Sequence, residues 1–545
     1  MEVPHHRVGL VDTVENSAAR SKNSAIGSDD HKPARSLRFW LVFLSLFVAV
    51  FLVCLEATVI STALPTIAKD LKISQFVWIG ACYALANAAA LPLCGGFAQV
   101  FGRKPVIVGS LILFIAGSAL GGSAHNQSVL LAARVVQGVG GGCTLALCTI
   151  IVSDLVSLSE RGTFNGILGL AFCISGGIGP LVGGALAQEG QWRWIFYINI
   201  PIAFFSLVMI LFTLQVPTPP GSIRQKLKVI DWGGNFIIVA STASCSIGLT
   251  WAGIQHPWIS AQVLVPLVVG LFGIMAFFVY EAFIPENPLI PYHVIGNRTS
   301  VSGFLQTFVL SIPHLSLLYY LPVYYQACKD ASPRASGVDL FGLAFGVAPV
   351  AVISGLSVTA FKFYRPQLVI GWIVLIIGSG VLSLITEDSP RGLSIGLQFV
   401  NGLGIGLVYM TVNFPILAPL PVSSTAQALA LYNYLRAIAQ TWGVTIGGAV
   451  LQNQLKHRLP LDFTNQFPDG VEIAYSIIPL IPELPQNLKD AVRASFAKAL
   501  SVLWQVHIGI AVAGLVASLF MRGLPLHTEI DKKWEMEGKE EQQKE

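Results

Sequence analysis

Residues 39–64 read FWLVFLSLFVAVFLVCLEATVISTAL, an apolar stretch long enough to cross a lipid bilayer as one helix. Its one charged side chain is Glu56. A charge at mid-bilayer costs roughly 3 kcal/mol on insertion scales, so such a residue usually faces a partner or a water-filled cavity. Because an apolar environment disfavours the charged form of a carboxylate, Glu56 can take up and release a proton. This stretch therefore predicts a transmembrane helix with a proton site, as a proton-driven transporter requires.

The composition of the whole chain agrees with a membrane protein. Of 545 residues, 54% are hydrophobic and 11% are charged, against roughly 25% charged in soluble domains. The formal net charge of +4 gives no reason to expect a nucleic-acid partner. Seven of the eight cysteines lie in apolar segments and none has zinc-site spacing, so we assign no disulfide, no metal and no cofactor. We expect the partners to be the bilayer, protons and a small molecule, with the chain acting as a monomer.

A window of about twenty residues finds about fourteen apolar segments. They are residues 39–64, 76–98, 105–124, 129–152, 163–187, 194–214, 232–254, 262–282, 299–325, 338–360, 367–386, 393–415, 425–452 and 501–522. The twelfth and thirteenth are divided only by the proline-rich link 415–421. Asp231, at the start of the seventh segment, is interpreted as a helix cap.

Lysine and arginine indicate the orientation, because they concentrate in cytosolic loops. With a cytosolic N-terminus, the cytosolic loops hold Arg103, Lys104, Arg298, Lys362 and Arg365 among others. We therefore expect both termini in the cytosol, in the plasma membrane or alternatively the vacuolar membrane. The tails are residues 1–37, polar and predicted to be disordered, and 523–545. A long charged loop, 453–500, is predicted outside, with an amphipathic interfacial helix over 487–499.

The loop between the second and third segments reads GGFAQVFGRK, residues 95–104. Glycines permit a tight turn there, and basic side chains can bond to helix ends. The stretch resembles the Gly-x-x-x-Asp-x-x-Gly-Arg-Lys signature of the major facilitator superfamily. That resemblance implies a role in conformational switching for Gly95, Gln99, Gly102, Arg103 and Lys104. Gln99 stands where the pattern has aspartate, so we expect a neutral hydrogen bond in place of a charged latch.

The fourth segment contains RVVQGVGGG, residues 134–142, and an arginine in an apolar helix needs a partner or water. Counted from the predicted outer boundary, Arg134 lies about 8 Å deep and Glu56 about 12 Å deep. The two can therefore couple. The stretch resembles the fourth-span motif of the superfamily, which is implicated in proton transfer. A structural ion pair is the alternative, and both can hold.

The fifth segment contains GGIGPLVGG, residues 176–184. Small residues four apart let helices approach closely, and proline kinks a helix. The stretch resembles the antiporter motif of exporters in the superfamily, which implies that it forms a hinge and a tight seal. The residues concerned are Gly176, Gly179, Pro180, Gly183 and Gly184. A generic glycine packing face is the alternative.

Further stretches resemble the fourteen-helix drug:proton antiporter branch. These are LEATVI (55–60), ALPTI (63–67) and WRWIFYINIP (192–201), together with Trp78, Tyr83 and Pro92 in the second segment. The branch usually has aspartate where this chain has Glu56. In the second half, YYLPVYYQ (319–326) resembles fungal-type toxin and multidrug exporters. The resemblance runs from about residue 39 to 522.

Polar and aromatic side chains in the segments suggest a substrate cavity. Asn433, Arg436 and Gln440 recur at helical spacing on one face of the thirteenth segment. The candidate cavity residues are Tyr83, Asn87, Gln137, His314, Tyr320, Tyr324, Asn433, Arg436 and Gln440. Aromatic residues in helices are more often packed or lipid-facing, and His314 is more often a buried histidine with a partner.

The resemblance implies an all-α membrane protein with the major facilitator fold. We expect two six-helix bundles, residues 38–214 and 299–522, with a linker, 215–298, that carries two extra transmembrane helices. The implied function is proton-coupled antiport that exports hydrophobic or amphiphilic small molecules, such as drugs, toxins or secondary metabolites, and not an enzyme reaction. The alternatives are a siderophore or basic amino-acid transporter of the same branch, or a non-transporting membrane sensor.

Overall fold

The computed structural model describes residues 35–71, 77–156, 158–217, 219–220, 222, 227–228, 230–253, 255–285, 290, 292–460, 474 and 477–525. Residues 1–34 and 526–545 of the predicted tails, residues 461–473 of the predicted outer loop and parts of the predicted linker lie outside this range. The chain divides into two units, residues 1–41 and 42–545. The arrangement described below is that of the second unit.

The described chain is almost entirely helical, and it contains no β-strand, only an isolated bridge between Ala252 and His256. The first half has α2 (Leu37–Leu71), α3 (Val77–Val100), α4 (Arg103–Gly122), α5 (Gln127–Leu155), α6 (Leu158–Gln188), α7 (Trp194–Tyr197) and α8 (Asn199–Thr213). Two further helices follow, α10 (Trp232–Trp251) and α11 (Ala261–Phe283). The second half has α12 (Tyr292–Ile295), α13 (Arg298–Cys328), α14 (Pro333–Asp339), α15 (Phe341–Phe361), α16 (Arg365–Leu382), α17 (Arg391–Thr411), α18 (Asn413–Leu417), α19 (Thr425–Arg458) and α22 (Gln486–Leu519), with short 3-10 turns at Val422–Ser424 and Ile478–Glu483.

Thirteen of the described helical stretches are long and apolar enough to cross a membrane. The predicted segment that is not among them is the thirteenth, which corresponds to α19; this helix is 34 residues long but carries the polar face of Asn433, Arg436 and Gln440. Burial within the protein compensates for this polarity, since Asn433 and Arg436 are both buried. The predicted all-α membrane architecture is therefore confirmed.

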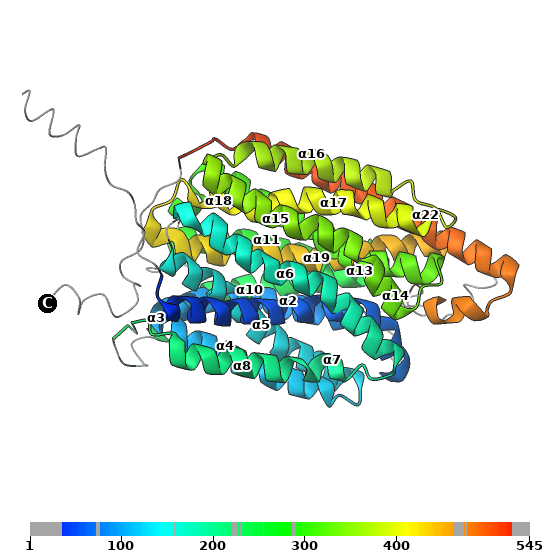
Figure 1. Cartoon of the computed structure of the whole chain (residues 1–545), viewed down its shortest axis with the longest axis horizontal. Helices are drawn as coiled ribbons and strands as arrows, with labels where there is room; N and C mark the ends of the chain where they lie inside the picture. The colour runs from blue at the N-terminus through cyan, green and yellow to red at the C-terminus, as the bar shows by residue number, and fades with distance from the viewer. Residues whose placement is uncertain are drawn as a thin grey trace, which may run out of the picture. The chain divides into compact units, whose positions relative to one another are not determined.

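The helices pack as two groups joined by a seam. In the first group α4 packs against α5 and α8, and in the second α16 packs against α17 and α22. Figure 1 shows these two groups, with α6 and α15 lying against each other between them. The extra pair α10 and α11 pack on each other, and α10 also contacts α3 and α19. The predicted division of the chain into two bundles and a linker stays a prediction.

Apolar side chains cover the outside of the helices, as contact with lipid requires. In α11 only 17% of the span is buried. Its exposed side chains include Val265, Val269, Phe272 and Met275. A helix that exposes so much apolar surface is stable only against hydrocarbon or another apolar partner.

Most predicted boundaries agree with the helices to within a few residues, but the last helix differs. We expected a separate interfacial helix over 487–499 and a span from residue 501, whereas α22 runs without a break from Gln486 to Leu519. The predicted amphipathic helix, residues 487–499, is therefore the first part of the same helix as the span. Asp231 caps α10 as predicted, because its Oδ1 accepts a hydrogen bond from the Gly234 N–H across 2.9 Å.

Candidate functional site

The Glu56 carboxylate lies inside the first group of helices and is fully buried. One of its oxygens forms an ion pair with Nη1 of Arg134 on α5, and the other accepts a hydrogen bond from the side-chain amide of Asn199 on α8. Arg134 is fully buried as well. The pairing of Glu56 with Arg134, inferred from their similar depth, is thus present in the structure.

Further hydrogen bonds fix the arginine. Its Nε donates to the Ile79 carbonyl of α3 across 3.1 Å, and its Nη1 donates to Oε1 of Gln137 across 2.8 Å. Gln137 in turn donates to Ser118 Oγ of α4 across 3.0 Å. Desolvation of a buried ion pair is offset only when such additional bonds are made. Nη2 of Arg134 and Oδ1 of Asn199 are the cluster's buried atoms without a hydrogen-bond partner among the described residues.

Tyr83 separates this cluster from a central cavity. The guanidinium of Arg134 lies 4.3 Å from the centroid of the Tyr83 ring. Tyr83, and not Glu56, lines the cavity, together with Ala57 and Thr58 from the turn that follows the carboxylate. The Glu56–Arg134 pair therefore lies one aromatic ring behind the cavity wall.

This central cavity lies between the two groups of helices and is mostly apolar. Its polar lining residues include Asn87, His314, Arg436 and Gln440, and its apolar ones include Phe172, Leu315, Leu343, Val347 and Met410. A second cavity, lined by Val50, Thr149, Ser153, Asn413 and Leu417 among others, shares Phe172, Tyr409, Met410 and Arg436 with the first. Its lining lies towards the predicted cytosolic ends of the helices, so the two cavities together extend in that direction.

The structure brings together five of the nine candidate cavity residues: Tyr83, Asn87, His314, Arg436 and Gln440 all line the central cavity. The other four lie elsewhere. Gln137 belongs to the Glu56 cluster, and Asn433 donates to Thr149 Oγ1 across 3.0 Å. The hydroxyls of Tyr320 and Tyr324 donate to the carbonyls of Val444 and Thr386, at 2.6 and 2.9 Å. These two rings therefore serve packing within the second half, which is the commoner role of aromatic residues.

Among the histidines, His314 differs from the expectation of a buried ring with partners. Its Nδ1 has no hydrogen-bond partner in the described structure, and its ring meets Tyr409 edge-on, with the centroids 5.4 Å apart. His314 therefore presents an unused polar atom beside the central cavity.

Arg436 lies 95% buried at the junction of the two cavities. Its Nη1 donates to the Tyr409 hydroxyl across 3.0 Å. Aromatic rings surround the guanidinium, with centroids 5.0 Å away for Phe172, 5.7 Å for Tyr409 and 5.6 Å for Tyr432. Such contacts stabilise a cation only in part.

The glycine- and proline-containing part of α6 lies between α2 and α14. On one side, Thr58 donates to the Ser175 carbonyl across 3.0 Å and Thr62 to the Pro180 carbonyl across 2.8 Å. A Cβ at Gly179 or Gly183 would collide with Thr58 or with the Val59 backbone. The predicted close helix approach is therefore present between α6 and the helix that carries Glu56.

On its other side, α6 touches the second half of the chain directly. The Gly184 position lies against the Pro333 backbone, and Gly337 of α14 lies against Pro180, where a Cβ would come within 2.7 Å of the carbonyl carbon. Gly176 has no heavy atom within 4 Å of its Cβ position, so it takes no part in this approach. The seam at the predicted outer end is thus a contact between backbones.

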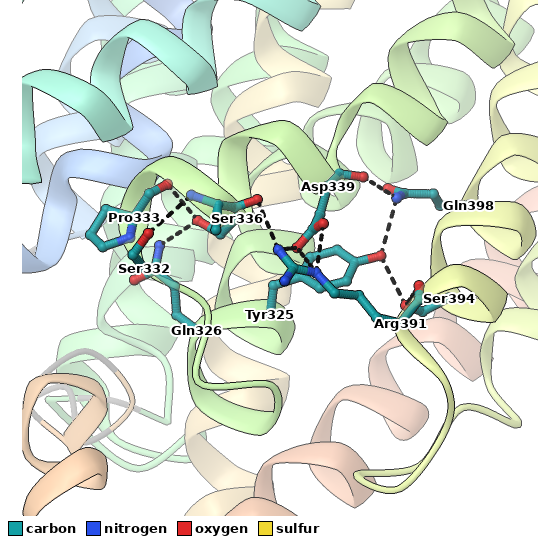
Figure 2. Close-up of polar contacts among 10 residues, drawn as sticks. Tyr325, Gln326, Ser332, Pro333, Ser336, Asp339, Arg391, Ser394 and Gln398 are labelled. Atoms are coloured by element: carbon teal, nitrogen blue, oxygen red, sulfur yellow. Dashed lines mark hydrogen bonds and ion pairs between the residues drawn. The ribbon is translucent and has the colours of Figure 1, made fainter.

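A polar network holds α14 in place at this seam (Figure 2). Arg391 donates from Nε to both carboxylate oxygens of Asp339, at 2.9 and 3.0 Å, and its Nη2 lies 2.8 Å from Oδ2. Gln398 donates to the Asp339 carbonyl and, across 3.1 Å, to the Tyr325 hydroxyl. Gln326 donates to Ser336 Oγ across 2.9 Å at the other end of α14. The network fixes α14 on α13 and α17, so its glycine face stays presented to α6.

The hydrogen bonds of the loop of residues 95–104 differ from the one expected at Gln99. Gln99 is exposed, and its side chain makes no hydrogen bond among the described residues. Instead Arg103, which is buried, donates to Asp154 of α5 across 3.1 Å and to the Ala98 carbonyl across 2.7 Å. Lys104 donates to the Leu211 carbonyl across 2.8 Å. Gly102, with φ of 90°, makes the turn that a residue with a side chain rarely adopts.

Sequence reasoning missed Asn199, Asp154 and the Asp339–Arg391 pair as members of these clusters. Asn199 lies in the stretch 192–201 that resembles the antiporter branch, and Asp154 is a carboxylate at the end of an apolar segment. Polar residues in such places are a usable signal, since each needs a partner when buried. Their partners come from other helices, which sequence spacing does not reveal.

Comparison with known proteins identifies the fold and the family. The profile described as Major Facilitator Superfamily matches residues 46–444. Two solved structures share the fold at low identity: the human organic anion transporter MFSD10 (TM-score 0.53, 15% identity, 88% of this chain and 100% of that one) and a bacterial homologue of the human lysosomal transporter Spinster (TM-score 0.57, 16% identity, 90% and 98%). At this identity the likeness concerns the fold alone.

Relatives with higher identity cover nearly the whole chain. "Efflux pump FUS6" of Gibberella moniliformis is 37% identical over 96% of this chain and 95% of its own length. "MFS-type efflux pump LUC4" of a Fusarium species is also 37% identical, over 94% and 93%. The "Acurin A biosynthesis cluster MFS-type transporter" of Aspergillus aculeatus is 35% identical, over 93% of each chain.

Proposed function

The chain belongs to the Major Facilitator Superfamily, and from that premise we propose that it is a proton-coupled antiporter that exports hydrophobic or amphiphilic small molecules. The names of its relatives support export, since they include efflux pumps and a transporter of a biosynthetic cluster. Drugs, toxins and secondary metabolites are the substrate classes proposed.

One observation carries the proton coupling: the buried Glu56–Arg134 pair stands directly behind the wall of the central cavity, with Tyr83 between them. A carboxylate in this position can gain a proton, which removes its attraction for the arginine. Glu56 then attracts Arg134 less strongly. Arg134 still has two other hydrogen-bond acceptors, the Ile79 carbonyl of α3 and the side chain of Gln137 on α5. Protonation therefore changes what holds α2, α3 and α5 together.

The same helix passes this change to the seam. Thr58 and Thr62 follow Glu56 by two and six positions and bond directly to the backbone of α6. A shift of α2 on protonation thus moves the segment of α6 that lies against α14. In the proposed cycle, Glu56 gains its proton from the outside and releases it towards the cytosol, so that proton entry is exchanged for substrate exit.

The lining of the central cavity supports an apolar or amphiphilic substrate over a basic amino acid. No aspartate or glutamate is among the described residues that line it. A basic amino-acid carrier needs a cavity carboxylate to bind the cationic side chain. A siderophore carrier is the alternative within the same branch.

We place the protein in the plasma membrane, with the vacuolar membrane as the alternative. Both termini are proposed to be cytosolic, and the protein is proposed to act as a monomer. The basic residues of the loops on one side support this orientation.

Proteoliposomes with an imposed pH gradient test the proposal. The full-length protein should drive uptake of an amphiphilic dye against its gradient, and a proton uncoupler should stop it. Glu56→Gln, which keeps the shape of the side chain, should abolish gradient-driven transport while still exchanging labelled for unlabelled dye. Glu189→Gln, at an exposed position, is the matched control and should transport normally. Normal gradient-driven transport by Glu56→Gln would refute the role of Glu56.

A further inference from the structure

Arg436 is a buried cation that lines the central cavity. In the part of the chain that the structure describes, no carboxylate forms an ion pair with it. Two buried carboxylates of the adjoining helix group, Glu56 and Asp154, are paired with Arg134 and Arg103. A buried cation without a counter-ion is costly, because water is excluded and aromatic rings replace only part of the lost solvation.

The surroundings of Arg436 fit a ligand and not only a packed side chain. Arg436 lines both cavities, the central one and the one towards the predicted cytosolic end. His314, with its unpartnered Nδ1, and Gln440 line the same central cavity. No other arginine and no lysine is among the described residues that line either cavity. Arg436 is therefore the one arginine or lysine among the described residues that line these mostly apolar cavities.

Guanidinium groups bind carboxylates with two parallel hydrogen bonds, and these bonds are strongest where water is excluded. The neighbouring rings of Phe172, Tyr409 and Tyr432 offer apolar and π surfaces for the rest of a molecule. An amphiphile with an acidic group would thus satisfy both parts of the site at once.

We propose that Arg436 is the recognition residue for an organic anion, and that the substrate of this transporter is an amphiphile with a carboxylate or similarly acidic group. The proposal rests on the transport function proposed above and narrows its substrate class. In this proposal the apolar lining of the cavity binds the body of the molecule, and Arg436 binds its acidic group.

Binding to the purified full-length protein in lipid nanodiscs tests this without requiring transport. The probes are pyrenebutyric acid, pyrenebutanol and pyrenebutylamine, which share one apolar body and differ in the charge of the head group. Quenching of tryptophan fluorescence gives the affinity of each. We expect the acid to bind at least about tenfold more tightly than the alcohol or the amine, as hydrogen bonds to a charged group imply.

Two variants locate the preference. Arg436→Gln should remove it and leave binding of the alcohol within about twofold, because the apolar lining is unchanged. Arg365→Gln, at an exposed arginine that lines neither cavity, should keep the preference for the acid. If Arg436→Gln does not fold, Arg436→Lys and the three-probe comparison on the native protein still decide. Equal affinity for all three probes, as when chloride alone neutralises Arg436, overturns the proposal, and so does a preference that survives Arg436→Gln.

Transport separates this proposal from the one before it. A native protein that moves pyrenebutanol with the pH gradient but shows no preference for the acid is an exporter without anion recognition. If the protein prefers the acid in nanodiscs but transports no probe in proteoliposomes, the anion site is supported and the proposed antiport function is refuted.

Discussion

The Thr62 hydroxyl donates a hydrogen bond across 2.8 Å to the backbone carbonyl of Pro180. This bond joins α2, which carries Glu56, to the part of α6 that meets the second half of the chain. Proline lacks an N–H, so the helix is already short of one hydrogen bond at this turn. A change at the carboxylate can reach the seam through a single side chain.

Thr62→Val should therefore weaken coupling between the two helices. It keeps the side-chain shape and removes about 1 kcal/mol of hydrogen bonding, so we expect gradient-driven export to fall about fivefold. Initial rates of dye transport in proteoliposomes measure this. The control is Thr250→Val, whose hydroxyl bonds within its own helix to Ser246. Equal loss in both variants would mean that α2 and α6 do not communicate through Thr62.

Two glycines of the same motif should respond differently to alanine. A methyl group at Gly183 would meet the Val59 carbonyl and come within 3.1 Å of Thr62 Oγ1, whereas one at Gly176 meets nothing within 4 Å. Gly183→Ala should lower the stability of the purified protein by about 1–3 kcal/mol, as overpacking does, and Gly176→Ala should leave it unchanged. Thermal unfolding compares them. Similar melting temperatures for the two variants would contradict the packing shown here.

The Asp339–Arg391 pair should behave as a coupled unit. Asp339 is almost fully buried, while the Arg391 side chain is 46% exposed. Arg391→Gln leaves a buried carboxylate without its partner and should destabilise by about 1–3 kcal/mol. Adding Asp339→Asn should recover part of that loss, because the uncompensated charge is gone. A double-mutant cycle of thermal stabilities measures the coupling, and strictly additive effects would show that the two side chains act independently.

Tyr83 should prevent protons from leaking. Its ring stands between the Arg134 guanidinium and the central cavity. Tyr83→Ala opens that wall, so protons should cross proteoliposome membranes without substrate, seen as faster collapse of an internal pH-dye signal. Tyr83→Phe retains the ring and should remain tight, although it loses the weak 3.4 Å bond to the Val53 carbonyl. A tight Tyr83→Ala variant would indicate that another residue forms the barrier.

The sequence predicted the helices well because transmembrane segments are dictated by length and apolarity, which are local properties. Glu56 and Arg134 were also paired correctly, since rise per residue gives depth. Depth does not give the direction in which a side chain points around its helix. That is why Tyr320 and Tyr324, on the same helix as His314, point away from the cavity that His314 lines.

Contacts between distant segments were the least predictable part. Asp154 is the partner of Arg103, and it lies in another helix, 51 residues further along the chain. Nothing local marks Asp339 as the partner of Arg391 either. Such pairs are set by how the helices rotate when they pack, and that rotation depends on every neighbour at once.

The seam between α6 and α14 is formed by backbone against backbone at Gly184 and Gly337. Contacts of this kind depend on shape and dispersion forces and contain no ionisable group. Screening or titration cannot act on these backbone contacts themselves, but salt or acid can reach the closure through the Asp339–Arg391 pair that holds α14. The exporter proposed here would therefore keep its outward face shut in brine or dilute acid for as long as that ion pair keeps α14 in place.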